Sequence, residues 1–198
     1  MLVWRLFMGK TYLTFKLSVI FALCLCSQAG AMLLDSWEND GVAGIGEASG
    51  PWMKDVKAPE SMTLAFSDKH VTEGNYSLAI TTKGGWAHAI SNSTDHTISL
   101  GDYGLRRALT NKLMISIDVF ADASLEWATM DVVMSGSGIN WIQLETKPMI
   151  PGDKTTLRYV TDPAIAEQLE QENTQFKLTL TINSKGPGTI YLDNFRAD

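Results

Sequence analysis

Short segments in which apolar and polar residues alternate restrict the fold of this chain more than any other feature of its sequence. Successive side chains of a β-strand point to opposite faces, so a period of two indicates a strand with one buried face. The clearest segment is FKLTLTI at 176–182. The same pattern predicts strands at 76–82, 86–91, 113–120, 126–134 and 140–146, and in GTIYLDNFRAD at the carboxyl end.

Glycine and proline clusters that are typical of turns lie between these segments. One helix is expected at 163–172, because Asp162 can cap its first turn and Pro163 suits its first position. Many short alternating strands and one short helix predict an all-β fold, an antiparallel β-sandwich. The sequence has no internal repeat and no linker, so residues 32–198 are expected to form a single domain.

The first 31 residues have the composition of a secretory signal peptide. They contain three basic residues, no acidic residue, and an apolar run at 17–26 that is too short to span a bilayer. The small residues Ala29, Gly30 and Ala31 provide a cleavage site. We therefore expect a protein that is secreted or periplasmic after bacterial export, with no membrane insertion once the signal peptide is removed.

The charge of the remaining chain limits its partners. Residues 32–198 contain all 22 acidic residues but only 13 of the 16 lysines and arginines, which gives a formal net charge of −9. This charge disfavours nucleic acids and anionic membrane surfaces, and it leaves neutral ligands and cations. Both cysteines lie before residue 32. An exported domain without disulfides must be stabilised by its core, by a metal ion, or by both.

Three motifs, in this order along the chain, resemble landmarks of secreted carbohydrate-binding modules with a galactose-binding-like jelly roll. They are LLDSWENDG at 33–41, VTEGNYSLAITTKGGW at 71–86, and GTIYLDNFRAD at 188–198. The first contains the aromatic and acidic pair Trp37 and Glu38, the second a G-x-x-S-L turn, and the third a Y-x-D-N ending. The resemblance covers the chain after the expected signal peptide, and it implies a jelly-roll β-sandwich that binds a polysaccharide or oligosaccharide.

The resemblance also implies a structural calcium ion where the first and last strands meet. Calcium takes about 6–8 oxygen ligands and accepts them from distant parts of a chain, so it would clip the two ends together. Asp35 and Asp40 are alternatives to the opening ligand Glu38. Without a metal, Asp193 and Asn194 would only cap the end of a strand. The ligands that the resemblance implies are Glu38, Asp193, Glu73, Gly74 and Asn75.

The side chains that the alternation directs outward indicate where a glycan would bind. If the apolar residues of 126–134 and 140–146 are in the core, tryptophans, an amide and carboxylates point away from it. An aromatic ring stacks on the C–H face of a pyranose, and amide and carboxylate groups bind its hydroxyl groups. Alternatively, a loop or the expected helix covers these tryptophans. The residues expected to bind the ligand are Trp141, Trp127, Gln143, Asp131 and Trp86.

The sequence contains no arrangement that is typical of a catalytic site. Its histidines, His70, His88 and His96, have no metal-binding spacing, and there is no Gly-x-Ser-x-Gly motif. The outward carboxylates Asp118 and Asp131 could in principle act in glycoside hydrolysis, where the distance between the two acids decides the mechanism, and the sequence does not give that distance. We therefore expect a non-catalytic carbohydrate-binding protein. The alternative is a structural or adhesive envelope protein that binds a protein partner, and a weak polysaccharide-degrading enzyme is less favoured.

Overall fold

Strands dominate the residues that the computed structural model describes, which are 32–35, 37–38, 52–54, 62–91, 114–137, 139–160, 162–169 and 175–198. These residues belong to one compact unit, Met32–Asp198. Its elements are β1 (Met32–Asp35), β2 (Trp52–Lys54), β3 (Thr63–Ser67), β4 (Ser77–Thr82), β5 (Gly85–Ser91), β6 (Ile115–Ala121), β7 (Trp127–Ser137), β8 (Ile139–Gln143), β9 (Lys147–Met149), β10 (Lys154–Tyr159), α3 (Pro163–Leu169), β11 (Gln175–Lys185) and β12 (Gly188–Ala197). No helix among the described residues has the length and apolar character needed to cross a bilayer.

The strands form two antiparallel sheets. Sheet A has the strand order β10-β6-β12-β4-β3, and β1 also pairs with β12. Sheet B has the order β2-β5-β11-β7-β8, and β9 also pairs with β7. Neighbours in each sheet are mostly distant in the sequence, as in a jelly roll. The expected fold class, an all-β antiparallel sandwich with a short helix, is therefore confirmed.

The core is a single cluster of buried apolar side chains to which both sheets contribute. Ile117 and Ile190 come from sheet A, and Val132 and Leu180 come from sheet B. Each of these residues is one member of an alternating set, so its neighbours along the strand face away from the cluster. The period of two therefore decides both what the core contains and which residues are left on the two outer faces.

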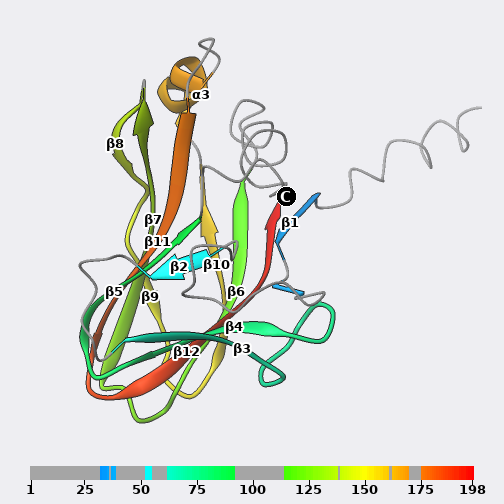
Figure 1. The fold of residues 1–198 in the computed structure, drawn as a ribbon, viewed down its shortest axis with the longest axis vertical. Coiled ribbons are helices and arrows are strands. Elements are labelled where there is room, and N and C mark those ends of the chain that lie inside the picture. Colours follow the sequence, from blue (N-terminus) through cyan, green and yellow to red (C-terminus); the bar gives the residue numbers. More distant parts are fainter. Residues whose placement is uncertain are drawn as a thin grey trace, which may run out of the picture. The chain divides into compact units, whose positions relative to one another are not determined.

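The first and last described strands lie side by side. Met32 is opposite Ala197, and Leu33 is opposite Arg196. Figure 1 shows the blue β1 beside the end of the red β12. Trp37, which follows β1, is buried and belongs to the core cluster. The two ends of the unit thus meet where β1 pairs with the last residues of β12 in sheet A, as the three motifs imply.

The predicted strands are all found, with different ends. The segment predicted at 126–134 continues to Ser137, whereas the one predicted at 140–146 stops at Gln143. The predicted helix is present and ends at Leu169, and 170–174 lie outside the described residues. The alternation did not predict five strands, because they are short or carry too few apolar residues: β1, which only the resemblance implied, and β2, β3, β9 and β10.

Candidate ligand-binding face and chain-end clip

The residues expected to bind a glycan come from three strands of sheet B. Ala128, Met130 and Val132 of β7 belong to the core, so Trp127 and Asp131 between them face outward. The same reasoning applies to Trp86, next to the buried Ala87 on β5, and to Trp141 and Gln143 of β8, which flank Ile142, a residue packed against the core. We call this surface the sheet B face.

The register between strands shows how the outward side chains are arranged. Two rows of outward residues cross β5, β11 and β7: Trp86–Asn183–Thr129 and His88–Thr181–Asp131. In the next row, Thr179 of β11 is opposite Val133 of β7, which is opposite Gln143 of β8. The ring of His88 contacts that of Trp86 edge to face, with centroids 6.5 Å apart and planes at 83°. The face therefore has Trp86 on β5 and Trp141 on β8, with polar residues on the strands between them, and Trp127 lies at the start of β7.

The three tryptophans of this face are open to solvent. Their exposed fractions are 63% for Trp141, 53% for Trp86 and 42% for Trp127. Tryptophan is usually well buried on average, so three exposed rings on one sheet face need an explanation. Within the described part of the chain, neither a loop nor α3 buries these three rings.

The centre of the sheet B face is polar and buried. Asp131 is 3% exposed and Thr181, its neighbour in the register, is 6% exposed. The side-chain amide of Gln143 donates a hydrogen bond to Oδ2 of Asp131 at 2.9 Å. The other oxygen of Asp131, Oδ1, and the hydroxyl of Thr181 have no hydrogen-bond partner. Buried polar atoms are normally paired, so these two atoms differ from the usual pattern of a folded interior.

Several residues of the face were not selected from the sequence. Thr179, Thr181 and Asn183 lie between the predicted residues, and His88 lies at their side. The alternation of 176–182 already directed the two threonines outward. No pattern in the sequence, however, indicates that β11 lies between β5 and β7, because that order depends on long-range pairing.

Near the place where the two chain ends meet, Glu38 binds the turn that follows β3. Its Oε1 accepts hydrogen bonds from the backbone amides of Asn75, at 2.6 Å, and Tyr76, at 2.8 Å. Its Oε2 accepts one from the side-chain amide of Asn75, at 3.1 Å. Burial by itself would raise the pKa of the Glu38 carboxyl, but these hydrogen bonds outweigh it and the pKa is lowered.

Asp193 of β12 binds the same turn from the opposite end of the chain. Its Oδ2 accepts hydrogen bonds from the backbone amides of Thr72 and Glu73, the latter at 2.8 Å. Its Oδ1 accepts a hydrogen bond from the backbone amide of Asn194 at 2.7 Å. The five residues expected to hold calcium, Glu38, Glu73, Gly74, Asn75 and Asp193, are thus brought together. We call the 72–76 loop and its two carboxylates the chain-end clip.

The contacts of the chain-end clip do not match the calcium site that the resemblance implies. Calcium needs oxygen ligands, yet the loop presents backbone N–H groups to both carboxylates. Among the residues described, no group of three or more His, Cys, Asp or Glu side chains could hold a metal ion. Asp35 is in β1, and Asp40 lies outside the described residues. Calcium therefore stays a prediction.

The outer face of sheet A, which we call the sheet A face, carries a cluster of charged side chains around Asp118. Asp118 of β6 accepts hydrogen bonds from the hydroxyls of Thr156, at 2.7 Å, and Thr72, at 2.9 Å. Lys154 and Arg196 form ion pairs with it at 3.6 and 3.4 Å. Burial would raise the pKa of Asp118, but the hydroxyl groups and the two positive charges outweigh it and the pKa is lowered.

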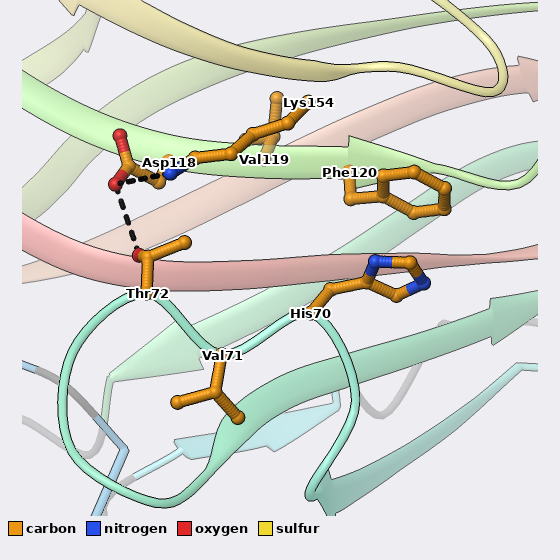
Figure 2. Close-up of a pocket in the computed structure, with 7 residues that line it drawn as sticks. All are labelled: His70, Val71, Thr72, Asp118, Val119, Phe120 and Lys154. Carbon is orange, nitrogen blue, oxygen red and sulfur yellow. Dashed lines mark hydrogen bonds and ion pairs between the residues drawn. The ribbon is translucent and has the colours of Figure 1, made fainter.

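A pocket of about 270 Å³ lies beside Asp118 on the sheet A face. Figure 2 shows Asp118 and Lys154 at one end of it and His70 and Phe120 at the other. The rings of His70 and Phe120 are stacked, with centroids 3.5 Å apart and planes at 10°. Thr72, Asp118 and Lys154 of this pocket are thus engaged with one another, unlike Oδ1 of Asp131 and the hydroxyl of Thr181 on the sheet B face.

The two carboxylates considered for glycoside hydrolysis do not form a pair. Asp118 is on β6 in sheet A, and Asp131 is on β7 in sheet B. Each faces away from the core, so the core separates them. The two acids of a glycosidase must flank a single bond, and this pair does not meet that requirement.

Comparison with known proteins gives likenesses of structure only. No protein-family model matches the chain, and no curated protein matches it. A structure solved in work on the promiscuous specificity of carbohydrate-binding modules of the β-sandwich superfamily has a TM-score of 0.50 and 11% identity, over 82% of this chain and 63% of the other. An exo-β-agarase has a TM-score of 0.54 and 7% identity, over 84% of this chain and 24% of the other.

A third match is the C-terminal family 22 carbohydrate-binding module of Clostridium thermocellum Xyn10B, with a TM-score of 0.48 and 15% identity, over 81% of this chain and 95% of the other. The chain spans less than two thirds of the length of the first two matches. At these identities the likeness concerns the fold alone. The chain has the jelly-roll β-sandwich fold found among carbohydrate-binding modules.

Proposed function

We propose that this chain is a secreted, non-catalytic carbohydrate-binding protein that binds a neutral glycan on the sheet B face. Trp141, Trp86 and Trp127 stack on pyranose rings, and Gln143 and Asp131 bind sugar hydroxyl groups. The expected signal peptide supports export of the protein, and the fold shared with carbohydrate-binding modules supports a binding role.

The observation that carries the proposal is the exposure of three tryptophans on one face of one sheet. An indole ring provides a large, rigid, flat surface that loses little conformational entropy when it binds. Such rings suit the C–H faces of sugars, because a pyranose ring has apolar faces and hydroxyl groups at its rim. A face with exposed rings and a polar centre matches both parts of a sugar.

The placement of the tryptophans suits an oligosaccharide. Trp86 is on β5 and Trp141 is on β8, and these strands are separated by β11 and β7. Adjacent strands lie about 4.8 Å apart, so the two strands are roughly 14 Å apart. Trp86 is in the same row as Asn183 and Thr129, whereas Trp141 lies beyond the row of Gln143 and Val133, so the two rings are also several rows apart along the strands. Their separation is larger than a single sugar ring, and an oligosaccharide that runs obliquely across the strands would contact both.

The polar groups of the face favour a neutral ligand. Asp131 is a carboxylate whose Oδ1 has no partner, so it needs a hydrogen-bond donor such as a sugar hydroxyl. The net charge of −9 in residues 32–198 also repels polyanionic glycans. A neutral polysaccharide provides hydroxyl donors for Asp131, and the net charge of the protein does not repel it.

Affinity electrophoresis in gels that contain neutral glucans, xylans, mannans or algal galactans tests the proposal. We expect retardation in at least one gel and loss of that retardation in the double variant Trp86→Ala with Trp141→Ala. The control is Tyr76→Ala, because Tyr76 is also an exposed aromatic residue but is not on sheet B. It should migrate as the wild type does.

Two results would contradict the proposal. One is migration that no glycan changes, and the other is retardation that survives in the double variant. A pull-down from envelope extracts that retains a protein, without competition by glycans, would instead favour the structural or adhesive alternative.

A further inference from the structure

We propose that hydrogen bonds, and not a calcium ion, hold the two ends of this unit together. In this arrangement the 72–76 loop binds the carboxylates of Glu38 and Asp193 through its backbone amides. The inference concerns the chain-end clip beside sheet A, so it does not depend on whether the sheet B face binds a glycan.

The direction of the loop amides is the first argument. The backbone N–H groups of Thr72, Glu73, Asn75 and Tyr76 all donate to the two carboxylates. Successive N–H groups that converge in this way carry partial positive charge and form a binding site for an anionic group. A cation beside the same oxygen atoms would meet these positive ends. It would also require about 6–8 oxygen ligands at about 2.3–2.6 Å.

Gly74, in the middle of the loop, provides the second argument. Its φ of +70° belongs to the left-handed region, which glycine adopts without the penalty that other residues incur. A Cβ atom at this position would lie 2.3 Å from Oε1 of Glu38. The carboxylate of Glu38 therefore occupies the space above the glycine. The glycine of the motif is needed for the contact between carboxylate and amides, whether or not a metal is present.

The balance of charge provides the third argument. Asp193 is opposite Asp118 in the register of β12 and β6, and the hydroxyl of Thr72 lies within 3.1 Å of an oxygen atom of each. Two buried carboxylates so close together need positive charge. Arg196 and Lys154 supply it at 3.4 and 3.6 Å from Asp118. The cluster is thus compensated by side chains of the chain itself.

The wild-type protein provides the main test. Its unfolding temperature, Tm, is measured after treatment with EDTA and after addition of calcium chloride, and its calcium content is measured by atomic emission. An ion that binds the folded state alone raises Tm with its concentration. We expect the same Tm in both buffers and calcium well below one equivalent.

Variants at Glu38 distinguish a hydrogen-bond acceptor from a metal ligand. The substitution Glu38→Gln retains an oxygen for the amides of Asn75 and Tyr76, and the side chain of Asn75 can turn its own oxygen to the new NH₂ group. This variant should keep a Tm close to that of the wild type. Glu38→Ala removes the acceptor and should lower Tm by roughly 5–10 °C in both buffers.

Asp193→Asn should also lower Tm equally in both buffers. Both oxygen atoms of Asp193 accept hydrogen bonds from backbone N–H groups. In the asparagine variant an NH₂ group replaces one of these oxygen atoms, and it cannot accept the hydrogen bond that this atom accepts. Glu126→Ala is the control, because Glu126 is exposed and its ion pair is with the exposed Lys185. It should melt as the wild type does. A wild-type Tm that falls with EDTA and is restored by calcium, with the response lost in Asp193→Asn, would overturn the proposal.

Discussion

The sheet A face and the sheet B face are built by the same alternation, yet they carry opposite chemistry. On the sheet A face, Asp118 is engaged by two hydroxyls and two cations. On the sheet B face, Asp131 has one partner for two oxygen atoms, and large aromatic rings are exposed around it. A polar group that the chain pairs with its own residues stabilises the fold, whereas exposed aromatic rings are available to a ligand. The paired groups of the sheet A face thus stabilise the fold, and the exposed rings make the sheet B face the candidate for binding.

The largest expected effect is on the sheet A face. Asp118→Ala should lower the free energy of unfolding by about 3 kcal/mol, because it leaves Arg196 and two hydroxyls without their buried acceptor. Urea denaturation followed by tryptophan fluorescence measures this change. Glycan affinity should stay as in the wild type, since Asp118 is in the other sheet. A comparable loss in Asp153→Ala, at an exposed position, would show that the effect is not specific to the buried cluster.

A smaller effect is expected from Gly74→Ala. A methyl group there would displace Glu38 from the amides of the 72–76 loop and would also strain the backbone. We expect a loss of about 2 kcal/mol in the free energy of unfolding. Gly85→Ala is a matched control, because Gly85 also has a positive φ, of +85°, but has open space around it. It should lose only about 1 kcal/mol. Equal losses in the two variants would mean that the contact with Glu38 contributes nothing.

For the sheet B face, the expected change is in affinity and not in stability. Trp141→Ala should weaken binding of the retained glycan about 10-fold, which corresponds to about 1.4 kcal/mol. Its free energy of unfolding should stay within about 0.5 kcal/mol of the wild-type value, because the ring is largely exposed. Isothermal titration and urea denaturation measure the two quantities. Arg158→Ala, at an exposed position of β10 in sheet A, should change neither, and a loss of glycan affinity there would remove the contrast between the faces.

The smallest expected effect is that of Thr181→Val. The hydroxyl of Thr181 is buried without a partner, so a methyl group of the same shape should leave the stability of the free protein unchanged or raise it by up to about 1 kcal/mol. If a sugar hydroxyl pairs with it, affinity should fall about 3-fold, or roughly 0.7 kcal/mol. Titration of the variant with the same glycan is the measurement. A stability loss above about 1 kcal/mol would show that the hydroxyl has a partner within the fold.

Much of the fold could be predicted because alternation is a local property. The strand at 176–182 was predicted to bury Leu178, Leu180 and Ile182, and all three belong to the core. The strand β10 was missed because only Leu157 and Tyr159 of its six residues are buried apolar side chains. A strand at the edge of a sheet needs few apolar residues, so its sequence resembles that of a loop.

The candidate sites were predicted unequally. Glu38 and Asp193 were placed together through the motifs around them, but their actual partners, backbone amides, carry no signature in the sequence. Asp118 and Asp131 were both directed outward by the alternation. Only the pairing of strands shows that they lie on different sheets.

By itself the sequence determined which residues alternate, and therefore which side of each strand is apolar, because the two faces of a strand are set by the backbone geometry of successive residues. It thereby determined that the fold is a sandwich and that Trp127 and Trp141 point outward. The tertiary structure decided which outward residues meet, because strand order and register depend on contacts between segments that are far apart in the chain. It paired Asp118 with Arg196 and left Asp131 beside Thr181, and that difference separates the stabilising face from the candidate binding face.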